Sequence, residues 1–405
     1  MTAGLSSLPS TASAFASTQA AWRFYANERV TLPALAQPLR EAARDAVVRD
    51  PPPWALVVHD QSLLRYPRHA RKTDQAELNH GLRGYELTAA LLVDGRTGDP
   101  IAPLELQLRA RKALYSTRPQ APSLQSCWLD ERLTAMRDAA ALLPCPLVHV
   151  LDRGADSVGH YRQWAADGRL FLVRADAAPT VSWRGCRWAL GDVARRLAAR
   201  QDFRPARTVV FRGREATQEV AEAEVVLTRP ACQHRLRGRA RHCRVPGEPL
   251  ALRLVVSRIR DAGGRVAATW LLLTNVPGRV TAAEIALWYY WRWRIESYFK
   301  LLKGAGRQLE HWQQGTAAAL AKRLLVAGMA CVVVWRLQRD GSPEAAEVRT
   351  VLVRLSGRQM KRGRDSTAPA LLAGLWVLLA GLAVLEQYGA AELEAMRKRV
   401  LGNTS

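Results

Sequence analysis

The chain has 405 residues, of which 48% are hydrophobic, so it can bury the core of one large domain or of two to three smaller ones. This composition excludes a disordered tail protein. Lysine and arginine number 59 against 36 acidic residues, which gives a formal net charge of +23. We therefore expect a polyanionic partner, with nucleic acid first and a membrane surface as the alternative. Six cysteines without regular pairing indicate a reducing, cytoplasmic compartment.

The predicted elements begin with short helices and turn to strands after three prolines at 51–53, where helix formation stops. Hydrophobic patterning then predicts strands at 54–60, 84–95, 101–111, 146–152 and 169–175, with a helix at 126–143 between the third and fourth strands. Three strands, a helix and a further strand form an α/β pattern with an antiparallel beginning.

Changes in pattern divide the chain into five predicted regions. Residues 1–53 form a short helical N-terminal region, and 54–180 the first part of an α/β core. Residues 181–275 read as a β-rich insertion, 276–340 as a helical return to the core, and 341–405 as a helical C-terminal subdomain that we expect to mediate dimerisation.

One apolar segment, 368–385, reaches the lower length limit for a membrane-spanning helix. Its glycines, Gly374 and Gly381, and its many alanines equally suit a helix packed tightly in a subdomain or a dimer interface. The apolar run at 324–335 is too short to cross a bilayer. We therefore expect no membrane partner.

Two carboxylates, Asp60 and Asp152, each end a predicted apolar strand, where open α/β sheets place their sites. A carboxylate in this position either caps the following turn or binds a cation. His59, next to Asp60, points to the opposite side of the strand and receives no role.

A third carboxylate, Glu296, lies in the stretch YYWRWRIESYFKLLKGAG at 289–306. At about 100° per residue, Tyr289, Arg292, Glu296 and Lys303 share one helix face of about 60°. Beside this face runs an apolar stripe made of Trp288, Trp291, Ile295, Tyr298, Phe299 and Leu302. The alternative is a solvated face with an ordinary i,i+4 pair between Arg292 and Glu296, which leaves the positions of the other two polar residues unexplained.

The spacing of Tyr289, Arg292, Glu296 and Lys303 resembles the Tyr-Arg-Glu-Lys signature of bacterial insertion-sequence transposases, in the hairpin-forming branch of the DDE group. Other stretches resemble the same family in the same order. These are TQAAWRFYANERV at 18–30, HDQS around the first aspartate, DRGAD at 152–156 and WLLLTNVP at 270–277.

The resemblance implies an RNase H-like catalytic core with a β-rich insertion between the second aspartate and the glutamate, together with helical N- and C-terminal regions. Asp60, Asp152 and Glu296 would be the catalytic, metal-binding triad. Mg²⁺ prefers such hard oxygen ligands, and two ions, with Mn²⁺ as a substitute, can assist an in-line phosphoryl displacement.

The resemblance also implies that Tyr289, Arg292 and Lys303 bind DNA phosphates at the transposon end. The family forms a DNA hairpin there, which requires a base to leave the stack. By its place in WLLLT, Trp270 is the candidate to receive that base by stacking. The alternative for Trp270 is an ordinary core tryptophan in a strand.

By this resemblance the protein is a cut-and-paste DNA transposase of the bacterial cytoplasm, associated with the nucleoid. It would act as a homodimer on double-stranded terminal inverted repeats and target DNA, by hydrolysis, hairpin formation and opening, and strand transfer. Two departures from the family are the 17 residues ahead of TQAAWRF, fewer than usual, and Gly154 in place of the usual glutamate, which we expect to loosen the loop after Asp152. The alternatives are a shortened, non-catalytic DNA-binding or inhibitory derivative and a simple metal-dependent nuclease.

The stretch CQHRLRGRARHC at 232–243 could be drawn as a zinc site, but its spacing does not match the usual paired ligands. Its arginines favour contact with the DNA backbone, with a solvated loop as the alternative.

Overall fold

The computed structural model describes residues 12–401 except 68, 70, 79–81, 121, 125–127, 236–240, 305–308, 310–311, 362 and 364–365. For 12–18, 232–235, 241–244, 304 and 401 it describes the backbone alone. The first 11 residues, the centre of the basic stretch at 232–243 and the last letters of the 289–306 stretch therefore lie outside the described residues.

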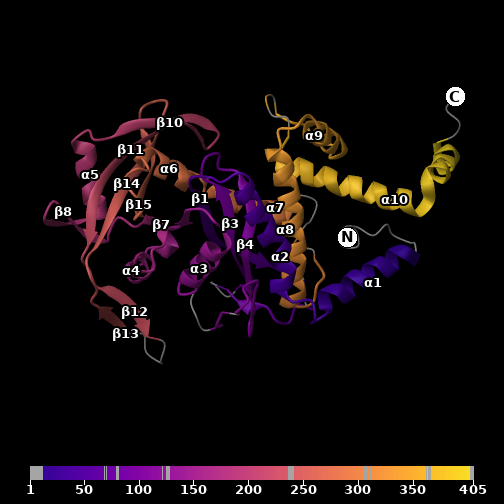
Figure 1. The fold of residues 1–405 in the computed structure, drawn as a ribbon, viewed down its shortest axis with the longest axis horizontal. Coiled ribbons are helices and arrows are strands. Elements are labelled where there is room, and N and C mark those ends of the chain that lie inside the picture. The colour runs from indigo at the N-terminus through magenta and orange to yellow at the C-terminus, as the bar shows by residue number, and fades with distance from the viewer. Residues whose placement is uncertain are drawn as a thin grey trace.

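Helices occupy both ends of the chain and flank the strands between them (Figure 1). The helices of the described residues are α1 (Ala12–Ala26), α2 (Leu32–Arg49), α3 (Arg132–Leu142), α4 (Val158–Ala166), α5 (Leu190–Ala199), α6 (Ala282–Trp291), α7 (Trp293–Gly304), α8 (Ala317–Arg339), α9 (Pro343–Leu355) and α10 (Ala368–Leu401), with a 3₁₀ turn, η3, at Arg153–Ala155.

The strands divide into a group before α4 and a group after it. The first group is β1 (Ala55–Arg65), β2 (Ala76–Glu77), β3 (Arg83–Asp94), β4 (Pro100–Arg109), β5 (Leu114–Ser116) and β6 (Leu147–Leu151). The second is β7 (Leu170–Ala175), β8 (Thr180–Trp183), β9 (Cys186–Ala189), β10 (Arg204–Phe211), β11 (Arg214–Leu227), β12 (Ala231–Arg235), β13 (Arg241–Val245), β14 (Leu250–Asp261) and β15 (Val266–Thr274).

One large mixed sheet runs through most of the described strands, in the order β5-β4-β3-β1-β6-β7-β15-β14-β11-β8-β9. The strands β1, β3 and β4 are antiparallel to one another, whereas β6 lies parallel to β1 and β7 parallel to β6. From β7 the sheet continues through antiparallel β15 into the strands between β8 and β14. The predicted mixed α/β architecture is confirmed, and β12 and β13 form a separate hairpin.

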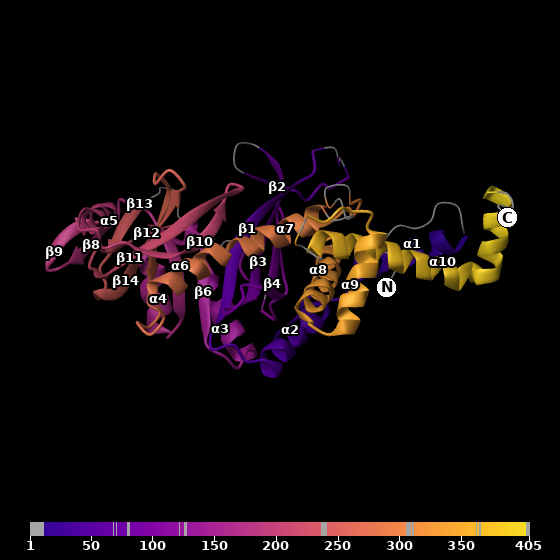
Figure 2. The same ribbon diagram turned by 90° about the horizontal axis from the view of Figure 1, so that it is seen from above.

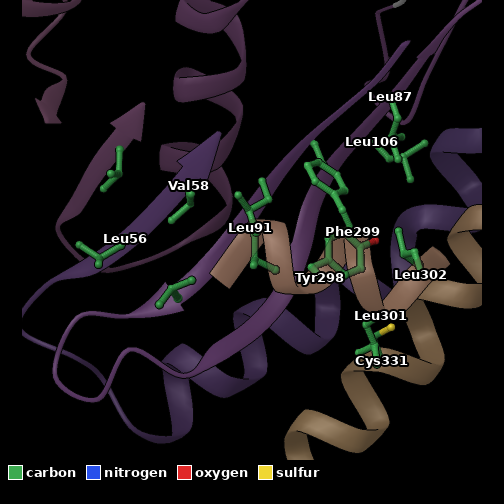
Figure 3. Packing of buried hydrophobic residues seen from close by; sticks show 14 of the residues in the cluster. Leu56, Val58, Leu87, Leu91, Leu106, Tyr298, Phe299, Leu301, Leu302 and Cys331 are labelled. Atoms are coloured by element: carbon green, nitrogen blue, oxygen red, sulfur yellow. The ribbon is translucent and has the colours of Figure 1, made fainter. Parts of the chain in front are cut away.

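Side-chain alternation along β1 divides the packing between the two faces of the sheet. Leu56 and Val58 belong to a core that includes Tyr298 and Phe299 of α7, and Figure 3 draws all four among the side chains of this one cluster. Ala55 and Val57 instead pack in a cluster with residues of α2 and α3. An even-numbered polar residue further along β1 therefore faces α7.

Strand β1 extends beyond its predicted end at Asp60. The pairing with β6 stops at Val58↔Val150, but the antiparallel pairing with β3 continues as far as Arg65↔Gly84. The prediction that Asp60 ends its strand is therefore wrong, because a neighbour on one side is enough to continue the strand. Asp60 lies instead where β1 loses its second neighbour.

The predicted single helix at 289–306 is divided in two at Arg292. Helix α6 begins with a capping box between Thr281 and Glu284. At Arg292 the backbone keeps helical angles (φ −50°, ψ −31°), and its N–H donates to the Tyr289 carbonyl, which tightens the turn before α7. The predicted apolar stripe is confirmed, since its members are buried apart from Trp291, which is partly buried.

The C-terminal helix α10 packs against α9 only near its beginning and then projects from the body (Figures 1 and 2). Gly374 explains this contact: a Cβ there would lie 1.8 Å from the Leu352 carbonyl oxygen, whereas one at Gly381 would meet nothing. Two of the described helices, α8 and α10, are long and apolar enough to cross a membrane, but α8 is largely covered by the protein. In α10, 22% of the apolar window is buried, so the tight packing expected of it holds only for its first turns.

Candidate active site

Asp60 and Asp152 come from the adjacent parallel strands β1 and β6. Asp152 directly follows β6, as predicted, and Asp60 lies two residues beyond the last β1–β6 pair. The two side chains are close enough for the charge of Asp152 to raise the pKa of Asp60. The sheet thus brings together two carboxylates that are 92 positions apart in the chain.

Helix α7 carries the third predicted carboxylate to the same place. Arg292 donates one hydrogen bond to Asp60 Oδ2 at 2.6 Å and another to Glu296 Oε1 at 2.9 Å. The i,i+4 pair of the alternative interpretation therefore exists, but this face is not simply solvated, because the guanidinium also reaches across to β1. Arg292 links the first and third carboxylates of the predicted triad.

Burial and charge act against each other on this cluster. Burial raises the pKa of Asp60, while the Arg292 guanidinium and the Gln61 backbone N–H lower it, so that the pKa ends above its usual value. Burial lowers the pKa of Arg292, yet attraction to Tyr289, Asp60 and Glu296 leaves it raised. Burial also raises the pKa of Tyr289, which is 8% exposed. Arg292 thus holds Asp60 and Glu296 together in a partly desolvated site, where the two carboxylates would otherwise repel each other.

The donor chemistry of this cluster suits a divalent cation, but its present arrangement does not form a complete cation site. Carboxylate oxygens are the ligands that Mg²⁺ prefers. Within the described part of the chain, no three His, Cys, Asp or Glu side chains are grouped as metal ligands would be. The positive charge between Asp60 and Glu296 is supplied by Arg292, which would have to release at least one of them to admit a metal ion.

Lys303, one of the predicted phosphate-binding residues, lies against β1. Its Nζ donates to Ser62 Oγ at 2.9 Å and to the Leu63 carbonyl at 3.1 Å. This contact ties the last turn of α7 to the part of β1 that follows Asp60. Lys303 therefore lies against β1 two to three residues beyond Asp60.

Trp270 lies in β15 and lines a hollow of about 690 Å³ together with Tyr289, Tyr290 and Trp293. Its ring meets Phe211 edge-on, with the centroids 6.2 Å apart. Trp270 is partly buried and packs against the main core, as a core tryptophan would. It also lines an open hollow, as a base-stacking tryptophan would. Residues of α6 and α7, the helices that carry Tyr289, Arg292 and Glu296, line the same hollow.

A buried polar network behind the carboxylates was not predicted. Arg132, fully buried in α3, donates to Glu105 Oε2 at 3.1 Å and lies 3.3 Å from His59 Nδ1. Because a guanidinium only donates, His59 must accept at Nδ1 and use its Nε2–H to donate to His149 Nδ1, 3.0 Å away. His59 faces away from Asp60, as expected, but it has a structural part in joining β1, β6 and α3.

The signal for this network in the sequence is weak. Each aspartate follows a histidine closely in an apolar strand, in VVHD and in VHVLD. Nothing in the sequence places Arg132 and Glu105 with these histidines, because the four residues come from different elements.

The loop after Asp152 forms the 3₁₀ turn η3. Asp152 Oδ1 accepts a hydrogen bond from the Gly154 N–H at 2.9 Å, so the carboxylate caps this turn while its charge also acts on Asp60. A Cβ at position 154 would lie 3.1 Å from Asp152 Oδ1, a close approach that glycine avoids. The capping role considered for this aspartate is therefore present, and cation binding stays a prediction.

The stretch once considered for zinc forms the hairpin β12–β13. Its backbone places Gln233 opposite Cys243 and His234 opposite His242, but residues 236–240 lie outside the described part. Whether this hairpin binds zinc is therefore not tested, and its contact with the DNA backbone stays a prediction.

The sequence and the fold were compared with protein families, curated proteins and solved structures. No model of a protein family matches the chain, and no curated protein matches it. One solved structure with some likeness is the cryo-EM structure of a piggyBac transposase synaptic complex with hairpin DNA, at a TM-score of 0.37 and 9% sequence identity. The match covers 88% of this chain and 55% of that chain. A likeness of this degree carries no argument about fold or function.

Proposed function

We propose that this protein is a DNA transposase with an RNase H-like catalytic core, which cuts and joins DNA by metal-dependent phosphoryl transfer. The observation that carries the proposal is the convergence of Asp60 from β1 and Glu296 from α7 on one guanidinium, with Asp152 from the neighbouring parallel strand acting on Asp60. The strand order β4-β3-β1-β6-β7, three antiparallel strands followed by two parallel ones, supports an RNase H-like core.

In this proposal Asp60, Asp152 and Glu296 would hold Mg²⁺, two ions in all, whose chemistry is to activate the attacking hydroxyl and to stabilise the leaving oxygen. Arg292 would turn from the carboxylates to a DNA phosphate as the site fills, because its planar fork binds either anion well. Lys303 is held beside Asp60 by its contacts with Ser62 and Leu63. It would add a point charge for the neighbouring phosphate.

The hollow beside Trp270 supports the hairpin step. Base stacking on an aromatic side chain stabilises a flipped nucleotide by roughly 1–3 kcal/mol. Trp270, Tyr289, Tyr290 and Trp293 offer several such surfaces around one space. The proposal assigns Trp270 the role of receiving a base, on terminal inverted repeats held by two copies of the chain in the bacterial cytoplasm.

A second candidate is a non-catalytic DNA-binding derivative that pairs with active transposases and inhibits them. The observation in its favour is the ion-pair bridge: Arg292 satisfies Asp60 and Glu296 without any metal ion. Such a protein would keep its DNA-binding surfaces and would not cut. Titration against an active transposase distinguishes the two candidates.

The test is a comparison of Glu296→Gln with the wild type on a DNA duplex that carries the inverted repeat flanking the coding region. The variant should bind this duplex almost unchanged but should lose strand cleavage in Mg²⁺, because an amide is a poor metal ligand. Glu347→Gln, which alters an exposed glutamate on α9, is the matched control and should cut normally. Full cleavage by Glu296→Gln would refute the triad, and replacing Tyr289 without effect would favour a simple nuclease.

A further inference from the structure

A basic hollow lies at the far end of β1, outside the cluster of carboxylates. It has a volume of about 1050 Å³, and its basic lining residues are Arg65, His69, Lys72, Arg83, Arg109 and Arg111. Within the described residues, Glu77 is the one acidic side chain that lines it. Figure 2 shows β2, which carries Glu77, at the edge of the molecule close to β1 and β3.

Among the residues that the structure describes, the exposed arginines of this hollow are gathered in one place without ion-pair partners, unlike those arginines of the chain that are held by carboxylates. Arg96 bridges Asp50 and Asp94, and many further arginines form ion pairs with acidic neighbours. In the described part of the chain, no acidic side chain forms an ion pair with Arg65, Arg83 or Arg111. Concentrated positive charge without acidic partners is the electrostatic footprint of a site for a polyanion.

The base of the hollow is a buried lysine. Lys72 is 4% exposed, donates from Nζ to the Gln314 carbonyl and lies over the Tyr66 ring, 4.6 Å from its centroid. Burial lowers the pKa of Lys72 to about 8, against the attraction of Asp74. An arriving phosphate would offset this desolvation and favour the charged amine.

The position of the hollow relates it to the proposed active site. Asp60, Ser62 and Leu64 alternate onto the α7 side of β1, where Lys303 contacts the strand, whereas Arg65 faces the other way. The hollow reaches the α7 side, about five residues beyond Asp60, through Arg83, which alternates with Tyr85, the partner of Leu64. Five residues of extended strand span about 17 Å. Because a DNA duplex rises about 3.4 Å per base pair, a duplex lying along β1 would bring a phosphate about five base pairs from the cleaved one to the hollow.

We propose that this basic hollow binds the phosphate backbone of duplex DNA about five base pairs from the phosphate acted on at Asp60. The inference rests on the proposed function, since it takes the carboxylate cluster as the place of cleavage. The contact is independent of base sequence, so it positions the duplex and does not read it. Lys303 contacts β1 between the carboxylate cluster and the basic hollow.

The experiment compares the double variant R83A/R111A with the control R44A/R49A, which removes two exposed arginines from α2. Binding of the terminal duplex is measured over a range of salt concentrations. Loss of two phosphate contacts should reduce the slope of log K against log salt by about 1.8, at about 0.9 per phosphate. Over a fourfold rise in salt, the wild type should then lose about twelvefold more affinity than the double variant. The control should keep the wild-type slope.

A second arm identifies the ligand. Neutral methylphosphonates placed four to six base pairs from the cleavage point should weaken binding of the wild type but have no further effect on R83A/R111A. A double variant that keeps the wild-type slope overturns the proposal. The proposal is also overturned if the hollow binds inorganic phosphate through its arginines while the salt dependence of DNA binding is the same in the double variant and the wild type.

These results separate the two proposals. A wild type that cuts DNA in a Glu296-dependent way, with an R83A/R111A slope equal to that of the control, refutes the hollow alone. Cleavage that does not depend on Glu296, together with a reduced slope for R83A/R111A, refutes the assignment of the carboxylates and leaves the hollow as a DNA-binding site. Thermal melting of both double variants checks that they fold as the wild type does.

Discussion

Replacing Arg292 with glutamine should improve the binding of divalent cations by the free protein. Arg292 now bridges Asp60 and Glu296 with hydrogen bonds of 2.6 and 2.9 Å, and all three side chains are largely shielded from solvent. A metal ion must displace at least one of these bonds. A hydrogen bond to a charged group contributes about 1.5–3 kcal/mol, so its displacement should weaken cation binding by roughly 10- to 150-fold.

Calorimetric titration with Mn²⁺ in the absence of DNA measures this effect, after the protein has been stripped of metal with a chelator. The variant Arg292→Gln should bind Mn²⁺ roughly 10- to 150-fold more tightly than the wild type, because removal of the guanidinium ends the competition. The same variant should cut DNA poorly, since it lacks a phosphate-binding group. Tighter binding of the metal and weaker catalysis would thus occur in one protein.

The matched control is Arg96→Gln. Arg96 also bridges two carboxylates, those of Asp50 and Asp94, but lies away from the proposed site. If any released carboxylate pair captured Mn²⁺, this control would gain affinity too. Equal affinity of Arg292→Gln and the wild type, or an equal gain in Arg96→Gln, would refute the reasoning.

Two further predictions concern the buried histidines and the aromatic hollow. Burial lowers the pKa of His149 to about 3, whereas in the unfolded chain this histidine takes up a proton below about pH 6.5. The free energy of unfolding should therefore fall as the pH drops below about 6.5, by about 2 kcal/mol at pH 5. This contribution should vanish in His149→Gln. Urea unfolding at pH 7 and pH 5 measures it, and an unchanged pH dependence in the variant would contradict the buried neutral pair. Trp270→Ala should nick the terminal duplex but form little hairpin, whereas Trp270→Phe should form it, as gels of labelled DNA would reveal. A wild-type hairpin yield in Trp270→Ala would instead identify a core tryptophan.

Local patterns in the sequence predicted the elements that position the site. The apolar runs before Asp60 and Asp152 predicted two strands, and helical spacing placed Arg292, Glu296 and Lys303 on one face. The structure brings these three side chains to the side of α7 that meets β1. These features depend on periodicity, which a sequence records directly.

Features that depend on pairing between distant segments could not be predicted. The continuation of β1 beyond Asp60 depends on its register with β3, and the second partner of Arg292 comes from a strand 232 positions away. The network of Arg132, Glu105 and the two histidines likewise exists only once separate elements pack. The division of the 289–306 helix at Arg292 is a matter of backbone hydrogen bonding, which angular spacing does not reveal.

The packing of α10 beyond its first turns could not be predicted from composition either. Composition suggested tight packing around Gly374 and Gly381, but only the first glycine meets a neighbouring backbone. The same apolar composition serves a packed helix and one that projects from the body. Which of the two occurs depends on whether another element is near.

The most direct test of a metal-dependent transposase built on Asp60, Asp152 and Glu296 is incubation of the wild-type protein with an end-labelled terminal repeat duplex and Mg²⁺. A denaturing gel should show a strand cut at the transposon end followed by a hairpin product, and neither should form with a chelator present. Tight binding of the duplex without any cut strand, in Mg²⁺ or Mn²⁺, would contradict the account.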